Sequence, residues 1–398
     1  MKKTLLSFVF VGAILFSGCQ SNKEEPLSSV IERGLSVATT QSLLMAKELE
    51  GQEGRLPKTL KPDGTLESSN YSWWCSGFFP GELWLLYENN PTNELRKYAE
   101  MYTARVEPAK KMTSTHDLGF MLGCSFGHGY RLTGNENYKQ ILLEGADSLA
   151  TRYNDHIGLI RSWDWNRDRW QYPVIIDNMM NLEFFTWATK MTGDQKYAHI
   201  ANSHAMKTMQ HHFRPDYSTY HVISYDLETG QPHAKHTHQG YADESVWARG
   251  QAWGLYGFTA MYRETGLIEY LHQAKSIADF LISHPRMPED KVMYWDFDAP
   301  DIPEAKRDAS AAAIMASALI ELSQLDKTSD SQKYLAFAEE QVRSLSSPEY
   351  LAEPGGNGLF TIKHCVGHLP GNSEVDVPLT YADYYYVEAL IRLKSLGK

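Results

Sequence analysis

Two aspartates, one arginine and one tryptophan stand at positions where their chemistry can combine. Asp117 follows His116 directly, and Asp177 follows an apolar run that carries it into a buried setting. Burial and a second carboxylate nearby raise the pKa of a carboxyl group, so such a pair can supply a general acid near neutral pH. Arg249 and Trp253 lie four residues apart and share one face of a predicted helix. A guanidinium fork beside a flat ring is suited to a planar, anionic sugar.

Each of these residues also has a structural interpretation. Asp117, Asp177 and Asp308 all lie where a predicted helix begins, and Asp is a preferred N-cap. That interpretation fits Asp308 better than Asp177, which emerges from the apolar run. Arg249 would then be a buried arginine that ties down a loop, and Trp253 a core aromatic. The residues alone leave both interpretations open.

The stretch 235–258 is the most unusual part of the chain. It combines histidines, a glutamine, an arginine, aromatic residues and glycines, whereas a solvated helix would be rich in Lys and Glu. Small residues between Trp and Tyr suggest that neighbouring elements approach the backbone closely and that the aromatic rings are presented to a ligand. A single histidine such as His221 is more often structural than a ligand contact. Since the histidines lie on predicted loops without paired i, i+4 spacing, we expect no metal site, and we expect no cofactor.

The elements that position these residues are predicted to be helices joined by short turns. At 132–138, 191–197 and 264–270 a helix ends at a glycine, and a tyrosine follows four residues later near the start of the next helix. Such turns join antiparallel neighbours. Counting outward from them predicts helices near 28–49, 76–89, 93–106, 117–132, 136–153, 178–191, 194–211, 246–264, 267–283, 308–325, 330–344 and 379–396.

These helices alternate in composition. Every second one is rich in Gly, Ala, Ser, Phe and Trp, while its neighbours carry Lys, Glu and Gln on one face. Inner and outer helices therefore alternate, which predicts an all-α fold of six helical hairpins closed into an (α/α)6 barrel. A superhelical array of helix pairs is the second choice. The long connections all lead into inner helices, so they gather at one rim, where function is expected.

The overall charge restricts the ligand. With 398 residues, a net charge of −11 and a pI near 5.8, the chain lacks the basic surface that nucleic acid requires. An anionic ligand would have to be bound by a few placed cations.

The first residues resemble an export signal. Lys2 and Lys3 precede an apolar run, and a Cys19 after small residues resembles the lipobox of bacterial lipoproteins, although Phe16 stands where Leu is usual. This predicts a signal peptide over 1–19, a polar tether over 20–30 and a single catalytic domain over 31–398. Because Gln20 is not Asp, the outer membrane is favoured, at its periplasmic or surface face. The other three cysteines match no zinc pattern, and no disulfide is expected.

Six segments together resemble the unsaturated glucuronyl hydrolase family, glycoside hydrolase family 88. They occur in the family's order, and the similarity covers nearly everything after about residue 30. They are WCSGF at 74–78, HDLGF at 116–120, DNMMN at 177–181, HQGY at 238–241, WARGQAWG at 247–254 and YADYY at 381–385.

The resemblance implies an (α/α)6 barrel and a substrate left by polysaccharide lyases. The family removes a 4,5-unsaturated glucuronyl residue from the non-reducing end of glycosaminoglycan oligosaccharides by hydrating its vinyl ether. Asp177 would protonate C4 and then help water to attack C5, while Asp117 would hold sugar hydroxyls and tune Asp177. The remaining contacts implied for the sugar are Trp74, His116, His221, Thr237, Gln239, Arg249 and Trp253. In the loop 363–376, which is expected to reach the leaving sugar, this chain departs from relatives that carry Ser and Lys to hold a sulfate, and His368 is the candidate contact there.

Three other functions remain. An unsaturated rhamnogalacturonyl hydrolase would have the same barrel and chemistry but pectin fragments as substrates. A lipid-anchored glycan-binding protein without turnover would need aromatics but not the pair Asp117 and Asp177. A sugar epimerase would be expected to rest on histidine acid–base pairs.

Overall fold

The computed structural model describes residues 25–398, so the expectations for the signal peptide, Cys19 and most of the tether lie outside it. Twelve α-helices in this range are joined alternately by long connections and short turns. They are α1 (Leu27–Leu49), α2 (Phe78–Asn89), α3 (Asn93–Val106), α4 (His128–Thr133), α5 (Glu136–Ala150), α6 (Leu182–Thr192), α7 (Gln195–His211), α8 (Ala248–Thr265), α9 (Ile268–Ser283), α10 (Ala309–Leu325), α11 (Asp330–Leu345) and α12 (Thr380–Ser395).

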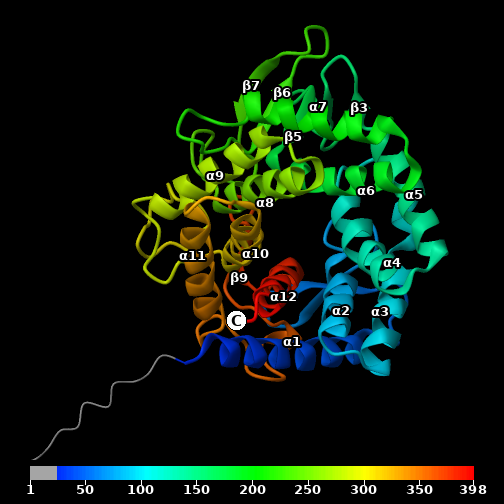
Figure 1. Ribbon diagram of the computed structural model, residues 1–398, viewed down its shortest axis with the longest axis vertical. Helices are drawn as coiled ribbons and strands as arrows, with labels where there is room; N and C mark the ends of the chain where they lie inside the picture. Colours follow the sequence, from blue (N-terminus) through cyan, green and yellow to red (C-terminus); the bar gives the residue numbers. More distant parts are fainter. Residues whose placement is uncertain (1–24) are drawn as a thin grey trace, which may run out of the picture.

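The even-numbered helices form a closed inner ring, and the odd-numbered helices surround it (Figure 1). The inner helices pack against one another around the ring, and α12 returns to pack against α2. Between α4 and α6 the contact is made by residues 119–127, which precede α4. The (α/α)6 barrel predicted from the sequence is confirmed. Most helix boundaries agree within a few residues, but the helix predicted at 117–132 is α-helical only from His128 onward, because residues 119–127 form a π-helix. No helix between residues 25 and 398 has the length and apolar character needed to cross a bilayer.

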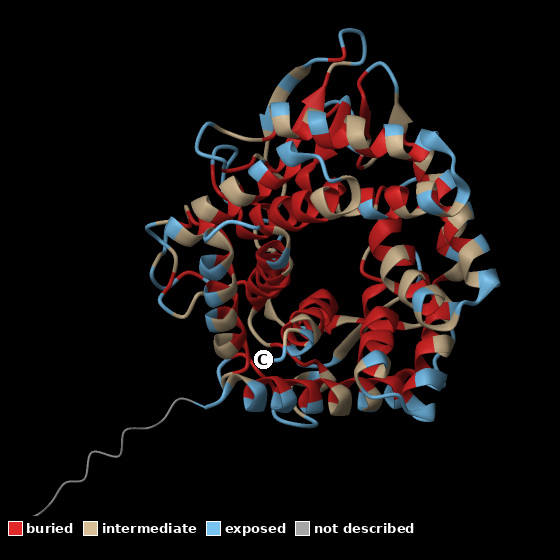
Figure 2. Ribbon diagram, viewed as in Figure 1, coloured by how far each residue is buried: buried red, intermediate tan, exposed pale blue. Residues whose placement is uncertain are grey.

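Burial follows the composition of the two rings (Figure 2). In α10 every residue from Ala309 to Ile320 is buried, because small side chains let neighbouring helices approach on all sides. The outer helix α5 buries only a stripe made of Ile141, Leu142, Gly145, Ala146 and Leu149. Such a stripe covers the inner ring and leaves the opposite face to water.

Tight turns close each hairpin on one side of the ring. Gly134, Gly193 and Gly266 end α4, α6 and α8 with φ values of 66°, 76° and 71°. This left-handed conformation is costly for residues with a Cβ, which explains the glycines that marked these turns in the sequence. Asn135 and Asp194 then cap the following helices through their side chains.

Small antiparallel sheets, which were not predicted from the sequence, occupy the long connections. They pair β1 (Leu56–Leu60) with β2 (Leu66–Ser69), β3 (Tyr153–Asn154) with β4 (Leu159–Ile160), and β8 (Cys365–His368) with β9 (Ser373–Val377). A three-stranded sheet joins β5 (Tyr172–Ile175), β6 (Val222–Tyr225) and β7 (Pro232–His236). Strands of two to five residues are too short to leave a clear period in the sequence. They stiffen the connections at the rim.

Two inner helices begin irregularly, and both carry candidate residues. A π-helix at Gly119–Gly127 (η2) runs into α4, and a 3-10 turn at Ile176–Asn181 (η3) runs into α6. Further 3-10 turns lie at Glu107–Lys111 and Asn357–Leu359. π-helical segments are rare and occur frequently at functional sites. Asp117 lies just before η2, and Asp177 lies within η3.

Candidate active site

Asp177 is held in a buried position by the strand before it. Strand β5 pairs with β6 and delivers the chain directly into η3, so Asp177 enters the barrel with only 8% of its surface exposed. This burial raises the pKa of its carboxyl group to about 7, and the negative charge of Asp117 adds to the rise. The guanidinium of Arg249 and the indole of Trp253 oppose it. A carboxyl with this pKa holds a proton in a large share of molecules at neutral pH.

His221 faces Asp177 as a neutral hydrogen-bond donor. Its Nδ1 accepts the backbone N–H groups of His238 and Gln239, at 3.0 and 3.1 Å. The proton of the neutral ring must therefore be on Nε2, which lies 3.9 Å from Oδ2 of Asp177. Burial lowers the pKa of His221 well below its usual value, so the ring stays uncharged. Neither Nε2 of His221 nor Oδ2 of Asp177 has another hydrogen-bond partner within residues 25–398.

Asp117 lies at the mouth beside Asp177 and is partly exposed. Thr115 donates a hydrogen bond from its hydroxyl to Oδ2 of Asp117, and Nε2 of His116 lies 3.3 Å from Oδ1. His116 is buried, and burial lowers its pKa, so it too is neutral near pH 7. The structure thus brings Asp117, His116, Asp177 and His221 together at the rim.

Two asparagines that were not among the candidate residues fix the spacing of the aspartates. Asn181 accepts the backbone N–H of Gly119 at 2.9 Å and donates to Oδ1 of Asn178 at 2.9 Å. Asn178 in turn donates to the carbonyl of Ile160 at 2.7 Å. The start of η2 is thereby tied to η3. Polar side chains inside the otherwise apolar segment 174–182 were the signal for this role.

Arg249 has a different role from the expected carboxylate fork. Its two terminal nitrogens donate to the carbonyls of Val366 and Gly367 in β8, the latter at 2.6 Å, and Nη1 lies 3.2 Å from Oδ2 of Asp308. Only 1% of Arg249 is exposed. The arginine therefore ties down the β8–β9 hairpin, and its charge reaches the site through space. Asp308 is the N-cap of α10, as expected, and accepts the backbone N–H of Ser310.

Trp253 is a core aromatic and offers no free face to a sugar. It is fully buried in α8, with its ring centroid 5.1 Å from that of Phe120 and 5.4 Å from that of Tyr385. The expectation of a stacking platform is wrong for this residue, because the inner helices close over both faces of the ring. Its indole N–H, however, has no hydrogen-bond partner in the range 25–398 and faces Asp177. Trp74 is half-buried at the rim, where its ring packs against those of Phe120 and Tyr381.

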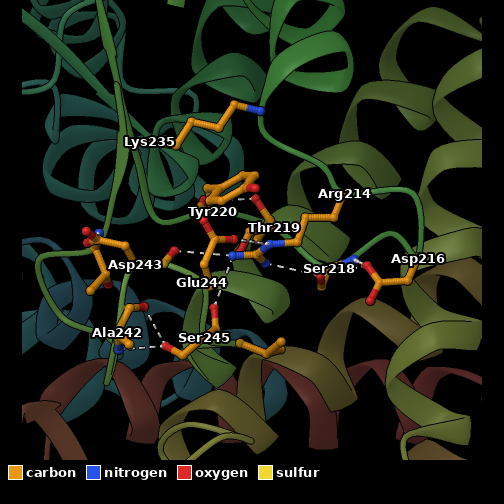
Figure 3. A network of polar contacts seen from close by, with 12 residues as sticks. Arg214, Asp216, Ser218, Thr219, Tyr220, Lys235, Ala242, Asp243, Glu244 and Ser245 are labelled. Atoms are coloured by element: carbon orange, nitrogen blue, oxygen red, sulfur yellow. Dashed lines mark hydrogen bonds and ion pairs between the residues drawn. The ribbon is translucent and has the colours of Figure 1, made fainter. Parts of the chain in front are cut away.

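The connection between α7 and α8 carries Thr237 and Gln239. The backbone N–H of Thr237 donates to Asp243 at 2.7 Å, and its hydroxyl accepts the N–H of Gly240 at 2.8 Å. Arg214 holds the base of this connection through the carbonyls of Asp243 and Ser245, at 3.3 and 3.4 Å (Figure 3). The segment with Thr237 and Gln239 is therefore built as a braced loop.

The same connection meets the β8–β9 hairpin across the rim. Gln239 donates to the carbonyl of Gly367 at 3.1 Å, and Nε2 of His368 lies 2.9 Å from the carbonyl of His238. The rings of His238 and His368 are 4.5 Å apart. His368 thus lies beside the loop that carries Gln239, on the far side of His238 from Asp177.

A separate cavity opens at the other end of the ring. It has a volume of about 490 Å³, and its walls come from the inner helices, but neither Asp117 nor Asp177 lines it. Phe120 lines the cavity and also packs against Trp74 and Trp253. That ring therefore lies between the cavity and the rim with the aspartates.

Within residues 25–398 there is no group of three or more His, Cys, Asp or Glu side chains that could hold a metal ion. Cys75, Cys124 and Cys365 are all unpaired. The chemistry available at the rim is proton transfer from a buried carboxylic acid, with two neutral histidines and a second carboxylate beside it.

The comparisons with known proteins agree with this geometry. The model of Glycosyl Hydrolase Family 88 matches residues 46–397. An unsaturated glucuronyl hydrolase of Formosa agariphila is 48% identical over 324 residues, which cover 81% of this chain and 80% of the relative. An unsaturated chondroitin disaccharide hydrolase of Streptococcus pneumoniae is 35% identical over 331 residues, covering 80% and 81%.

Solved structures show the same likeness. An unsaturated glucuronyl hydrolase specific for heparin superposes with a TM-score of 0.90 at 46% identity, covering 93% of this chain and 98% of the other. A mutant enzyme from Streptococcus agalactiae, complexed with dGlcA-GalNAc6S, gives a TM-score of 0.77 at 29% identity and covers 92% and 91%. The resemblance stated from the six sequence segments is confirmed, and the chain belongs to glycosyl hydrolase family 88.

Proposed function

We propose that this enzyme is an unsaturated glucuronyl hydrolase, which removes the 4,5-unsaturated glucuronyl residue from the non-reducing end of lyase-generated glycosaminoglycan oligosaccharides. The observation that carries the proposal is Asp177, a buried carboxyl with a pKa of about 7 that faces the neutral donor His221. Hydration of a vinyl ether needs such an acid, because its first step is protonation of carbon. The named relatives with this activity support the same reaction.

The site residues divide the reaction into two proton transfers. Protonated Asp177 gives its proton to C4 of the double bond, which leaves positive charge on C5 and the ring oxygen. The carboxylate that remains accepts a proton from water as the water oxygen bonds to C5. The resulting hemiketal opens and releases the next sugar, and Asp177 regains the proton that it needs for the next turnover. Preorganised charge at the site stabilises the cationic intermediate.

The neighbouring residues set the conditions for this proton cycle. The negative charge of Asp117 raises the pKa of Asp177, while the remaining acceptor capacity of its carboxylate oxygens can take hydrogen bonds from sugar hydroxyls. The N–H groups of His221 and Trp253 face the carboxyl group of Asp177 from within the protein. Trp74, which is half-buried at the rim, supplies a ring against which the flat unsaturated sugar can stack. Thr237, Gln239 and His116 complete the wall of the site.

The test follows loss of the ultraviolet absorbance of the conjugated double bond. Unsaturated disaccharides from hyaluronan, chondroitin, heparin and rhamnogalacturonan are each given to the wild type and to Asp177→Asn. We expect turnover of glucuronyl disaccharides by the wild type and a loss of about 10²–10⁴-fold in kcat in the variant. The control is Asp155→Asn, which changes an exposed aspartate in the β3–β4 turn and should retain full activity.

Two outcomes would overturn the proposal. Turnover of the rhamnogalacturonan disaccharide alone would assign the enzyme to pectin fragments. Binding of a disaccharide with no turnover of any substrate would indicate a glycan-binding protein.

We further propose that the mature chain is held at the outer membrane by a lipid on Cys19. The support is the sequence 2–19, with two lysines, an apolar run and small residues before Cys19. Replacing Cys19 with Ser should move the protein from the membrane fraction to the soluble fraction, and should abolish incorporation of a labelled fatty acid. Retention of both properties in the variant would exclude the anchor.

A further inference from the structure

The connection between β4 and β5 presents an exposed tryptophan at the catalytic rim. Of the ten tryptophans in the chain, only Trp73 and Trp165 are exposed, by 37% and 48%. The ring of Trp165 is stacked on that of Trp163, with centroids 4.8 Å apart and planes at 12°. Stacking fixes the orientation of the exposed ring and leaves its outer side to solvent. An exposed indole ring that is held in place at a rim offers a flat face on which a sugar ring can stack.

The base of this connection is rigid and is tied to the catalytic acid. Asp164 is held by Arg152 at 2.9 Å and by Arg161 at 2.7 Å. Ser162 accepts the backbone N–H of Ile175 at 3.0 Å, two residues before Asp177. The position of Trp163 and Trp165 relative to the acid is therefore fixed by the fold.

A continuous series of rings leads from the acid to Trp165. His221 faces Asp177 at 3.9 Å, and its Nδ1 accepts the backbone N–H of His238. The ring of His238 lies 5.2 Å from that of Trp165 and 5.9 Å from that of Trp163. Since the unsaturated sugar is the end of its chain, the rest of an oligosaccharide can leave Asp177 in one direction only. His238 and the two tryptophans provide the surface along which it can extend.

Positive charge accompanies this surface. Arg169 is exposed and makes no ion pair with any residue between 25 and 398, and its guanidinium lies 4.7 Å from the centre of the Trp170 ring. Its charge also reaches His238, whose pKa falls to about 4, chiefly through burial. Glycosaminoglycans alternate uronate with amino sugar, so the third ring from the unsaturated end carries a carboxylate. An exposed ring beside a free guanidinium matches an anionic sugar.

We propose that Trp165 and Arg169 form a subsite for the third sugar of the substrate, a uronate. The inference rests on the proposed function for its substrate class. The subsite makes the enzyme selective for tetrasaccharides and longer fragments over disaccharides, because only the longer chains reach Trp165.

The experiment compares kcat/KM for the unsaturated tetrasaccharide and disaccharide prepared from one unsulfated glycosaminoglycan. We expect a ratio above one for the wild type, and a fall of about two- to tenfold in that ratio for Trp165→Ala, since the lost contact is an aromatic stack. Trp165→Phe keeps a flat ring and should restore most of the ratio. Arg169→Gln should lower the ratio about two- to fivefold at low ionic strength and much less in 1 M salt.

Two control variants test whether the effect is specific to this surface. Trp73→Ala removes the other exposed tryptophan, and Arg96→Gln removes an exposed arginine on α3; both should keep the wild-type ratio. An unchanged ratio in Trp165→Ala, or a fall in Trp73→Ala alone, would overturn the proposal.

The proposed function and the subsite can fail separately. Tetrasaccharide binding to Asp177→Asn, measured by calorimetry, does not depend on turnover. If Trp165→Ala weakens this binding while the wild type turns over neither the disaccharide nor the tetrasaccharide, the subsite stands and the proposed function falls. If disaccharides are turned over but neither ratio nor binding depends on Trp165, the subsite falls alone.

Discussion

At the scale of single residues, opposing interactions determine the pKa of Asp177. Burial and Asp117 favour its protonated form, while Arg249 and Trp253 favour the carboxylate. A pKa of about 7 is the result, and it lets one group act first as an acid and then as a base near neutral pH. His221 cannot replace it as the acid, because its buried ring stays neutral.

The first prediction concerns the pH dependence of activity. Because the protonated form of Asp177 starts the reaction, kcat should fall as the pH rises through about 7. Asp117→Asn removes a charge that raises the pKa of Asp177, so the alkaline limb of the kcat profile should move to lower pH. Steady-state profiles from pH 5 to 9 check this shift. A limb that stays in place or moves upward would show that Asp117 does not act on Asp177.

The second prediction concerns stability. A carboxyl whose pKa is higher in the folded than in the unfolded state makes the folded state bind more protons, so stability falls as the pH rises between the two values, here from about 4 to about 7. Asp177→Asn removes this penalty and should raise the free energy of unfolding by roughly 1–3 kcal/mol at pH 8. Denaturant unfolding at pH 4 and pH 8 measures the gain, which should nearly vanish at pH 4.

The role of a residue could be predicted from the sequence where its neighbours in the chain determine that role. The apolar run before Asp177 predicted that this residue is buried, and it is. The position of Asp308 at the start of a predicted helix favoured an N-cap, and Asp308 caps α10. Arg249 and Trp253 share a helix face, but what covers that face comes from β8 and from Tyr385, more than 110 residues later in the chain. No local pattern contains that information.

At the scale of elements, inner helices approach one another through glycine. A Cβ on Gly77, just before α2, would lie 2.1 Å from the carbonyl oxygen of Met121 and 2.2 Å from that of Phe120. Both atoms belong to the backbone of η2, so neither can turn away. The close contact holds α2 against the π-helix that follows Asp117.

The third prediction tests this contact. Gly77→Ala should lower the free energy of unfolding by about 3 kcal/mol or more and should reduce activity, because η2 must shift. Gly123→Ala is the matched control, since a Cβ there meets no atom within 4 Å. It should be neutral or stabilise the fold by up to about 1 kcal/mol. Thermal unfolding of the two variants provides the comparison, and equal stability would contradict the role of Gly77.

Helix boundaries could be predicted because glycine turns and composition mark them locally. The π-helix at Gly119–Gly127 and the 3-10 turn at Ile176–Asn181 could not, since both arise where Asn181 bonds to Gly119 across two elements. The sheet of β5, β6 and β7 could not be predicted either, because β5 pairs with a segment that is distant in the chain. The partner of β5 is β6, which lies beyond the whole of α6 and α7.

At the scale of the whole molecule, carboxyl groups buried outside the active site limit stability at high pH. Glu82 of α2 and Asp383 of α12 are buried, and burial raises the pKa of both, that of Asp383 to about 7. Their hydrogen-bond donors are uncharged: Ser42 donates to Glu82, and the backbone N–H groups of Thr361 and Ile362 donate to Asp383. The pair lies between the first and last inner helices.

The fourth prediction follows from this pair. Both pKa values are raised in the folded state, so the folded protein loses stability as the pH rises toward and above 7. Glu82→Gln should reduce that loss and raise the unfolding free energy by about 1–2 kcal/mol at pH 9 relative to pH 5. Glu88→Gln on the same helix is the control: its pKa is lowered by Arg131, and its loss should give no alkaline gain. Thermal unfolding from pH 5 to 9 separates the two.

Because α12 closes the ring, the barrel can be completed only late in the synthesis of the described chain. The first inner helix, α2, lacks one neighbour until residues 380–395 have been made, and Arg249 lacks its carbonyl partners until β8 exists. Until these segments have been synthesised, the ring of inner helices stays open beside α2, and Arg249 has no carbonyl groups of β8 to bind. Activity should appear only after α12 has emerged, so termination anywhere before α12 yields a chain without a working site.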